Sequence, residues 1–298
     1  MKRFIVLMAA AINFISLFGQ TKSVSGYFKE GKVMEGQKIQ SKILGYEVNY
    51  SVYLPPDYDI SNRSYPVVYL LHGYSDNETA WVQFGEVNIS ADRAIANRDI
   101  PPMIIIMPDA KITWYLNDYS GKNRYEDMFI QEFIPAMESS YRIRPGKEYR
   151  AISGLSMGGF GALLYSLHHP DMFVACVAFS AGVFTDEEIK DMPEDVYKDR
   201  FNGLYTGDNS NRFTDYWKKN NILDLVHSMS KEEIEKVKIM IDCGDDDFLY
   251  KGNSALHVAL RDKNVYHEYR VRDGSHNWTY WRSGIPDALR FIGDSFHR

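Results

Sequence analysis

The sequence predicts an α/β fold, with a mostly parallel central sheet covered by helices on both faces. Short, continuous apolar runs alternate with segments of helical periodicity through the body of the chain, and strands buried on both faces have this character. The first two expected strands instead alternate between apolar and polar residues, which is typical of antiparallel strands. One apolar run leads through a sharp glycine-rich turn into a helix. Strands and helices that alternate in this way favour a parallel sheet.

The expected elements follow one another in a regular order after a polar, extended lead-in over residues 22–37. Strands are expected at 38–42, 46–54, 65–71, 103–107, 149–152, 176–179, 237–242 and 266–271. Helices are expected at 89–97, 125–141, from 159 to about 169, at 253–264 and at 278–296. We interpret residues 21–298 as one domain, since 298 residues are within reach of a single large α/β unit.

Residues 182–234 interrupt this alternation of expected strands and helices. They are rich in Asp, Glu, Asn and Lys, with scattered aromatic residues. We expect a partly helical excursion between two sheet strands, which either caps the site or forms a solvated surface insertion.

The first twenty residues have the layout of a secretory signal peptide. A basic start, Met1-Lys2-Arg3, precedes an apolar run from Phe4 to Phe18 that only Asn13 and Ser16 interrupt. The run is short for a membrane span, so an uncleaved anchor is the weaker alternative. We expect an exported protein without stable membrane association.

Charge and cysteine content narrow the possible partners. The net charge is −6 and the body of the chain has no block of Lys and Arg, so nucleic acid is not an expected partner. Cys176 and Cys243 each lie in an apolar, strand-like run. Buried free thiols are the usual outcome for such positions, although an exported chain could oxidise them to a disulfide.

The pentapeptide Gly154-Leu155-Ser156-Met157-Gly158 has the pattern G-x-S-x-G between an expected strand and an expected helix. In that setting the serine stands on a strained turn with its hydroxyl at the start of the helix, and glycines supply the space. A capping serine in a glycine-rich turn is the alternative. The context predicts that Ser156 is a nucleophile.

A serine nucleophile needs a base to accept its proton, and the base needs an orienting carboxylate. In this fold class both follow the serine along the chain. His276 fits the base, because it follows the last expected strand in a flexible Asp-Gly-Ser-His loop. For the acid we expect Asp247, with Asp246 second and Asp245 solvated, since three adjacent carboxylates cannot all be buried. The apolar residues 248–250 could bury the chosen acid.

An ester carbonyl develops negative charge during the reaction, and two backbone N–H groups usually receive it. The residue after the serine, Met157, and the loop residue Tyr74 are the expected donors. His72 is expected to brace that loop. Trp114, Tyr115 and Trp278 are expected to contact substrate, because each lies near a predicted catalytic position.

Together these stretches resemble the esterase D-like, feruloyl-esterase group of α/β-hydrolases, the first carbohydrate-esterase family. The matching segments are Tyr69–Gly73, Trp114–Asn117, Tyr125–Asp127, Gly154–Gly159, Cys243–Leu249 and Gly274–Trp278, within about residues 36–295. The resemblance implies an α/β-hydrolase fold, a Ser-His-Asp triad with Asp247 as its acid, no metal and no organic cofactor. It also implies hydrolysis of feruloyl, acetyl or short-chain esters, or acyl transfer in some relatives.

The sequence therefore predicts an exported serine esterase that acts on esters of plant cell-wall polysaccharide, such as feruloylated xylan. An acetylxylan or general short-chain carboxylesterase is the closest alternative. A signal peptide argues against a cytosolic S-formylglutathione hydrolase. An aligned nucleophile and base argue against a non-catalytic polysaccharide-binding protein.

Overall fold

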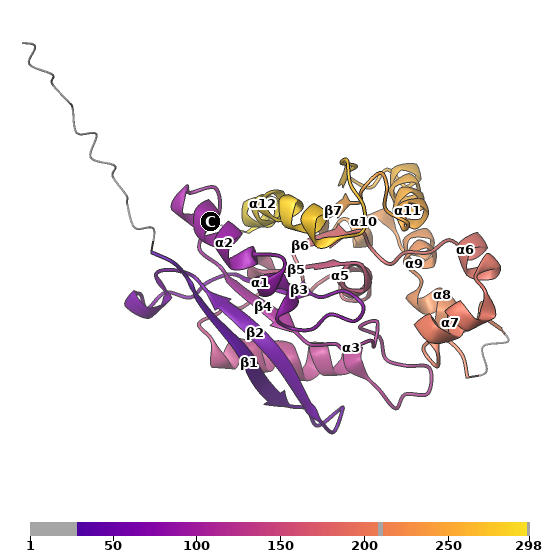
Figure 1. Ribbon diagram of the computed structural model, residues 1–298, viewed down its shortest axis with the longest axis horizontal. Helices are drawn as coiled ribbons and strands as arrows, with labels where there is room; N and C mark the ends of the chain where they lie inside the picture. The colour runs from indigo at the N-terminus through magenta and orange to yellow at the C-terminus, as the bar shows by residue number, and fades with distance from the viewer. Residues whose placement is uncertain (1–28, 208–210, 297–298) are drawn as a thin grey trace, which may run out of the picture.

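Eight strands form one sheet in the order β1-β2-β4-β3-β5-β6-β7-β8 within the described part of the chain (Figure 1). The computed structural model describes residues 29–207 and 211–296, so the predicted signal peptide lies outside the described residues. The strands are β1 (Lys32–Gln40), β2 (Glu47–Leu54), β3 (Val67–Leu71), β4 (Ile104–Pro108), β5 (Arg150–Leu155), β6 (Ala175–Phe179), β7 (Lys238–Asp242) and β8 (His267–Arg270).

Strand directions match the predicted pattern. The pairs β1–β2 and β2–β4 are antiparallel, and all other neighbours in the sheet are parallel. One expectation was wrong at the start, where residues 32–37 already belong to β1 and are not only a lead-in. β1 pairs with β2 along its length, with a register shift between Met34 and Gln37. Hydrogen bonding to β2 thus extends the strand beyond its apolar alternation.

The helices of the body include α1 (Ala80–Gln83), α2 (Val87–Ala96), α5 (Met157–His168), α11 (Tyr250–Asp262) and α12 (Trp278–Ser295). The predicted helix over 125–141 consists of α3 (Tyr125–Met128), a π-helical segment η2 (Phe129–Phe133) and α4 (Ile134–Ser140). Short 3₁₀ turns occur at η1 (Tyr58–Ile60) and η3 (Lys147–Tyr149).

Alternate residues of the strands point to two separate apolar layers, which is the geometry that buries a parallel sheet on both sides. In β3, Tyr69 and Leu71 pack on the side of α3, α4 and α5, whereas Val68 and Leu70 pack on the side of α2 and α12. Figure 1 shows α2 and α12 on one side of the sheet and α3 on the other. The predicted α/β fold with helices on both faces is confirmed.

Residues between β6 and β7 form the predicted excursion, and helices occupy much of it. These are α6 (Asp186–Asp191), α7 (Glu194–Phe201), α8 (Asp215–Asn220), α9 (Ile222–Ser228) and α10 (Lys231–Ile234). Side-chain caps begin four of them: Thr185, Thr214, Asn221 and Ser230 each accept a bond from a backbone N–H of the first turn. In Figure 1, α6, α7 and α8 lie at the end of the molecule away from β1.

Candidate active site

The turn from β5 to α5 holds Ser156 in a backbone conformation that few residues other than glycine adopt, with φ +54° and ψ −117°. Its N–H donates to the Phe179 carbonyl at 2.9 Å, which ties the turn to the next strand. The flanking glycines are required by contact. A Cβ atom on Gly154 would lie 2.3 Å from the Gly158 carbonyl oxygen, and one on Gly158 would lie 2.4 Å from the Leu71 oxygen. The turn therefore has the geometry that the G-x-S-x-G pattern predicts.

Ser156, His276 and Asp247 form one hydrogen-bonded chain. His276 Nε2 lies 3.0 Å from Ser156 Oγ, and His276 Nδ1 lies 2.9 Å from Asp247 Oδ2 and 3.0 Å from Oδ1. Because Nδ1 faces a carboxylate, the neutral ring carries its hydrogen there and leaves Nε2 to accept the serine proton. The three residues come from loops that follow β5, β7 and β8.

Only one of the three adjacent acids is buried. Asp245 and Asp246 are exposed, whereas Asp247 is 1% exposed and accepts a bond from the Leu249 N–H at 2.9 Å. Burial raises the pKa of Asp247, but hydrogen bonds from His276, Ser180 and the Leu249 N–H outweigh it, so the pKa lies below its ordinary value. Asp247 is therefore the ionised acceptor that His276 contacts.

The three apolar residues after Asp247, which the sequence suggested could bury the acid, lie in different environments. Leu249 is buried, but Phe248 and Tyr250 are exposed. Phe248 packs instead on His276, with ring centroids 4.5 Å apart, and Trp281 contacts the imidazole edge-on at 4.9 Å. The imidazole is thus held between two aromatic rings.

A buried ionic group fixes the loop that carries His276. Asp242, at the end of β7, accepts bonds from Arg272 Nε at 3.1 Å and Nη2 at 3.2 Å, and a further bond from the Tyr280 hydroxyl. Asp242 is 1% exposed, so these partners compensate a charge that would otherwise be costly to bury. Arg272 and Tyr280 flank the loop and anchor both of its ends.

The loop after β3 lies against the serine. A Cβ atom on Gly73 would lie 3.6 Å from Ser156 Cβ. His72 accepts a bond from the Ala110 N–H at Nε2 (2.8 Å), so its Nδ1 donates to the Gly73 carbonyl at 2.7 Å. This is the bracing arrangement expected of His72. Tyr74 follows it, and Met157 begins α5, where the first N–H groups have no partner within the helix.

A cavity of about 500 Å³ opens above Ser156, and we call it the Ser156 cavity. Ser156, His276, Leu155 and Gly73 are among its lining residues. Its aromatic lining residues are Tyr74, Trp114, Phe184, Phe248, Trp278 and Trp281.

Two of the three aromatic residues predicted to contact substrate line this cavity, and one prediction was wrong. Tyr115 is fully buried in the core, where its hydroxyl donates to the His72 carbonyl at 3.0 Å. Trp114 and Tyr115 both have positive φ, at 54° and 59°. This turn sends the Trp114 ring to the cavity and the Tyr115 ring into the core.

Several residues of the site were not anticipated from the sequence. Ser180 accepts a bond from Trp281 Nε1 at 3.0 Å and supports Asp247. Phe184, Asp199 and Arg200 bring the excursion to the cavity wall. For Ser180, the available signal in the sequence was its position directly after β6, the strand next to β5, which leads to Ser156. The three excursion residues are set by tertiary packing and had none.

Two groups of side chains in the described residues have the spacing of metal ligands. Glu126, His168 and His169 form the first, and the exposed Asp245, Asp246 and Asp273 form the second. Glu126 Oε1 already binds His168 Nδ1 at 2.8 Å and His169 Nε2 at 2.9 Å. Neither group contacts Ser156 in the hydrogen bonds described above.

Two further observations concern the cysteines and the apolar character of the helices. Cys176 and Cys243 are buried free thiols, as predicted, and burial raises the pKa of the Cys176 thiol to about 12. Among the described residues, none of the helices has the length and apolarity needed to cross a membrane.

Comparison with known proteins identifies the class to which this fold and site belong. A solved ferulic acid esterase superposes with a TM-score of 0.78 at 32% identity, over 90% of this chain and 100% of that chain. An acetyl esterase of Caldicellulosiruptor saccharolyticus is 27% identical over 78% of this chain and 85% of its own length. The chain is a carboxylic ester hydrolase of the α/β-hydrolase class.

The family follows from a wider match. A family model described as "Putative esterase" matches residues 41–292, and the chain belongs to that family. The predicted resemblance to the esterase D-like, feruloyl-esterase group is confirmed. An endo-1,4-beta-xylanase/feruloyl esterase of Xylanibacter ruminicola is 35% identical over 47% of this chain, which spans 20% of that longer protein.

Proposed function

We propose that the protein is an exported serine esterase that removes feruloyl groups from plant cell-wall polysaccharide through an acyl-enzyme on Ser156. The observation that carries this proposal is the aromatic lining of the Ser156 cavity beside an ordered Ser-His-Asp chain. A cavity of this size and lining suits a small, largely apolar acyl group. The likeness to a ferulic acid esterase at 32% identity supports the choice of acyl group.

In the first half of the reaction, Ser156 Oγ attacks the ester carbonyl carbon while His276 Nε2 takes its proton. Asp247 stabilises the imidazolium that forms and keeps the ring in the required orientation. Negative charge moves to the former carbonyl oxygen, and the N–H groups of Tyr74 and Met157 receive it. His276 then protonates the departing alcohol oxygen as the tetrahedral intermediate collapses.

In the second half, water replaces the alcohol. His276 Nε2 removes a proton from water, the resulting oxygen nucleophile attacks the acyl carbon, and the bond to Ser156 Oγ breaks with return of the proton to serine. The products are the alcohol and a free carboxylic acid. Every proton transfer uses one nitrogen, which the 3.0 Å contact already places beside the serine.

A short-chain acetyl esterase is the second candidate, and the similarity to an acetyl esterase over 78% of the chain favours it. The two candidates share the chemistry and differ in what fills the cavity. An aromatic acyl group gains about 0.5–1.5 kcal/mol from each well-placed ring, whereas an acetyl group leaves the rings uncovered.

A panel of esters tests the choice between these candidates. We expect kcat/KM for methyl ferulate to exceed that for methyl butyrate by about 30-fold, the effect of two aromatic contacts of average strength. Equal or reversed values would favour the short-chain esterase. A fluorophosphonate probe followed by peptide mass spectrometry tests the nucleophile separately: the adduct should lie on Ser156, and an adduct elsewhere contradicts the mechanism.

Export is a separate part of the proposal and rests on residues 1–20. Protein isolated from its natural host should begin close to Gln20 and remain in the aqueous phase of a detergent partition. An intact Met1 on a membrane-bound chain contradicts export and leaves the esterase chemistry untouched.

A further inference from the structure

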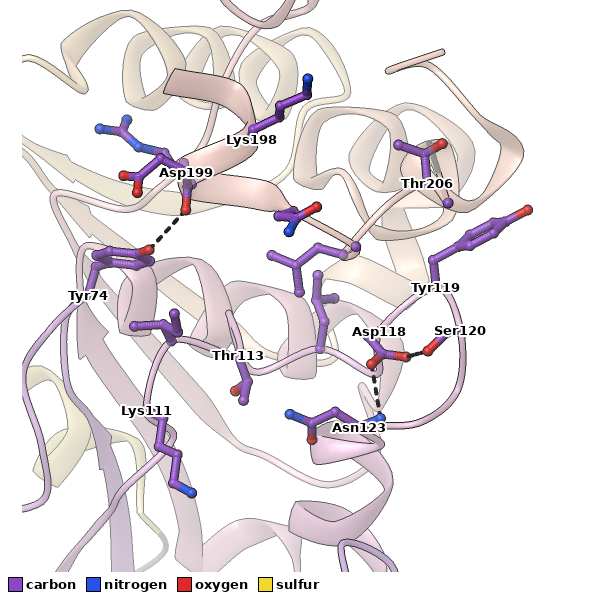
Figure 2. Close-up of a pocket in the computed structure, with 17 residues that line it drawn as sticks. Tyr74, Lys111, Thr113, Asp118, Tyr119, Ser120, Asn123, Lys198, Asp199 and Thr206 are labelled. Atoms are coloured by element: carbon purple, nitrogen blue, oxygen red, sulfur yellow. Dashed lines mark hydrogen bonds between the residues drawn. The ribbon is translucent and has the colours of Figure 1, made fainter. Parts of the chain in front are cut away.

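A second cavity, of about 690 Å³, adjoins the Ser156 cavity, and we call it the Tyr119 cavity. Residues 111–123 line one side, and the end of α7 with residues 202–207 lines the other (Figure 2). Tyr74, Asp199 and Arg200 line both cavities. The Tyr74 hydroxyl donates to the Asp199 carbonyl at 3.2 Å, as Figure 2 shows, so one bridged wall separates the two spaces.

The common wall places the second cavity beside the Ser156 cavity. Tyr74 contributes its ring to the wall and follows Gly73, the residue that lies against Ser156. An ester held at Ser156 has two arms, and the acyl arm occupies the aromatic Ser156 cavity in the proposed function. The alcohol arm then needs a path from the serine to the surface, and the Tyr119 cavity begins on the far side of Tyr74.

The lining of the Tyr119 cavity differs in chemistry from that of the Ser156 cavity. Its polar side chains carry carboxylate, amide, hydroxyl and ammonium groups, from Asp118, Asn123, Thr113, Ser120, Lys111 and Lys198. Two carboxylates (Asp118 and Asp199) and three cationic side chains (Lys111, Lys198 and Arg200) line the cavity, so neither charge sign is alone there. These groups offer donors and acceptors side by side, as a neutral ligand with many hydroxyls requires.

An aromatic ring stands exposed at the rim of this polar cavity. Tyr119 is 50% exposed, and its ring packs edge-on against Tyr216 with centroids 5.7 Å apart. Its backbone N–H donates to the carbonyls of Gly203 (3.2 Å) and Leu204 (3.0 Å) in the excursion. These contacts restrain Tyr119 while half of the residue stays exposed, and such restraint lowers the entropy cost of binding.

The loop that carries this ring is itself ordered. Asp118 accepts bonds from the Ser120 hydroxyl at 2.8 Å and from the Lys122 and Asn123 N–H groups, both at 3.0 Å. Figure 2 shows Asp118, Ser120 and Asn123 gathered at this end of the cavity. The polar groups and the ring are therefore positioned before any ligand arrives.

We propose that the Tyr119 cavity binds the carbohydrate on the alcohol side of the ester, with a sugar face on the Tyr119 ring and sugar hydroxyls on the polar groups. A sugar has apolar C–H faces and a rim of hydroxyls, and this lining complements both. The inference rests on the proposed esterase function, and it assigns the leaving group of that same reaction to a place in the structure.

The test compares two esters of the same acid. Methyl ferulate has no sugar, whereas a feruloylated arabinoxylan oligosaccharide fills both cavities. Wild-type enzyme should show a higher kcat/KM for the oligosaccharide, mainly through a lower KM. Tyr119→Ala should reduce the ratio of the two kcat/KM values by about threefold to tenfold, the effect of one lost ring contact.

Tyr266→Ala is the matched control, because Tyr266 is 78% exposed and precedes β8, at the end of the strand away from the His276 loop. It should leave the ratio unchanged. A second variant, Lys198→Ala, removes an exposed cavity side chain from a surface position and should reduce the ratio by a smaller factor. If Tyr119→Ala and Tyr266→Ala give the same ratio as wild type, the inference is wrong.

A binding measurement separates failure of this inference from failure of the proposed function. Unesterified arabinoxylan oligosaccharide should bind by titration calorimetry to wild-type protein, and at least threefold more weakly to Tyr119→Ala. If wild type hydrolyses neither ester but binds the oligosaccharide in this way, the proposed function fails and the sugar site stands. If it hydrolyses methyl ferulate but does not bind the oligosaccharide, the sugar site fails alone.

Discussion

The two walls of the Ser156 cavity are built in different ways. One wall consists of loops at the ends of sheet strands, and buried ionic and backbone bonds hold each loop, as Asp242 does with Arg272. The other wall comes from the excursion, where short helices are joined to the body by an aromatic cluster around Trp114. Reaction geometry therefore depends on the sheet, and the shape of the cavity depends on side-chain packing.

This difference indicates which wall of the Ser156 cavity tolerates changes in sequence. The loops at the carboxyl ends of these parallel strands are anchored by the buried bonds described above, which hold the reacting atoms within hydrogen-bond distance. The excursion can repack around new substrates without moving the reacting atoms. The predictions below break one wall at a time, from the largest expected effect to the smallest.

Ser156→Ala removes the nucleophile from the wall formed by loops at the strand ends, which we call the sheet-borne wall. We expect kcat for p-nitrophenyl acetate to fall at least about 10⁴-fold, since the remaining N–H donors and binding supply only weak catalysis. The melting temperature should stay within about 2 °C of wild type, because the φ angle and backbone bonds are retained. Near-wild-type turnover by the folded variant would contradict the role of Ser156.

Asp247→Asn should lower kcat by about 10³–10⁴-fold, because the neutral amide no longer enforces the orientation and tautomer of His276. The matched control is Asp246→Asn, an exposed neighbour on the same loop, which should change kcat by less than about threefold. Steady-state kinetics with one activated ester compares them. A severe effect at Asp246 would move the acid by one residue.

Trp114→Ala breaks the other wall. Trp114 is 4% exposed, and its Nε1 donates to the Arg200 carbonyl at 3.0 Å. We expect the free energy of unfolding to fall by about 3–5 kcal/mol, as for other buried aromatic residues. Hydrogen exchange should quicken over residues 184–205, and preference for methyl ferulate should narrow.

Trp278→Ala provides the comparison for that variant. Trp278 lines the same cavity but packs on the body, against Trp81 at 5.2 Å. It should narrow the ferulate preference without changing exchange over residues 184–205. If both tryptophans alter exchange in the excursion equally, the two walls are not independent.

A pH titration addresses a weaker link between body and excursion. Burial raises the pKa of Glu126, but its bonds from His168 and His169 outweigh burial and lower the pKa to about 2. Burial lowers the pKa of His168, but the Glu126 bond outweighs burial and raises it above 6.5. His168 Nε2 also contacts the Lys219 carbonyl of α8 at 2.9 Å.

The signs of these shifts define a pH window. The Glu126 contribution is present above about pH 4.5 and is lost as the pH falls toward 2, whereas the His168 contribution is complete below about pH 6.5 and is lost at higher pH. Glu126→Gln should therefore cost the most, about 2 kcal/mol, between pH 4.5 and 6.5. Denaturant unfolding measures this cost, and a pH-independent difference would contradict the assignment.

Much of the sheet-borne wall could be predicted from the sequence, because local patterns determine it. Apolar runs marked the strands, and the motif around Ser156 marked the turn. Three adjacent acids cannot all be buried, and Asp247 was chosen among them from the apolar residues 248–250 that follow it and from the family resemblance. The order of residues along an α/β chain then brings the strand ends together.

The excursion wall could not be predicted in the same way. Phe184 and Arg200 reach the cavity through contacts with Trp114, and no spacing in the sequence encodes such a contact. Tyr115 failed for a related reason. It was expected to contact substrate only because it lies near a predicted catalytic position, and a turn with positive φ at Trp114 and Tyr115 directs its ring into the core instead.

The φ angle of Ser156 also creates a trade-off between the stability of the fold and catalytic activity at this position. Glycine adopts φ +54° without strain, so Ser156→Gly should unfold at a higher temperature than Ser156→Ala and yet hydrolyse no ester. Selection for a more stable protein alone would therefore replace the nucleophile. A serine is retained at this turn only while ester hydrolysis itself is under selection. The strained backbone of Ser156 therefore indicates that the activity is selected.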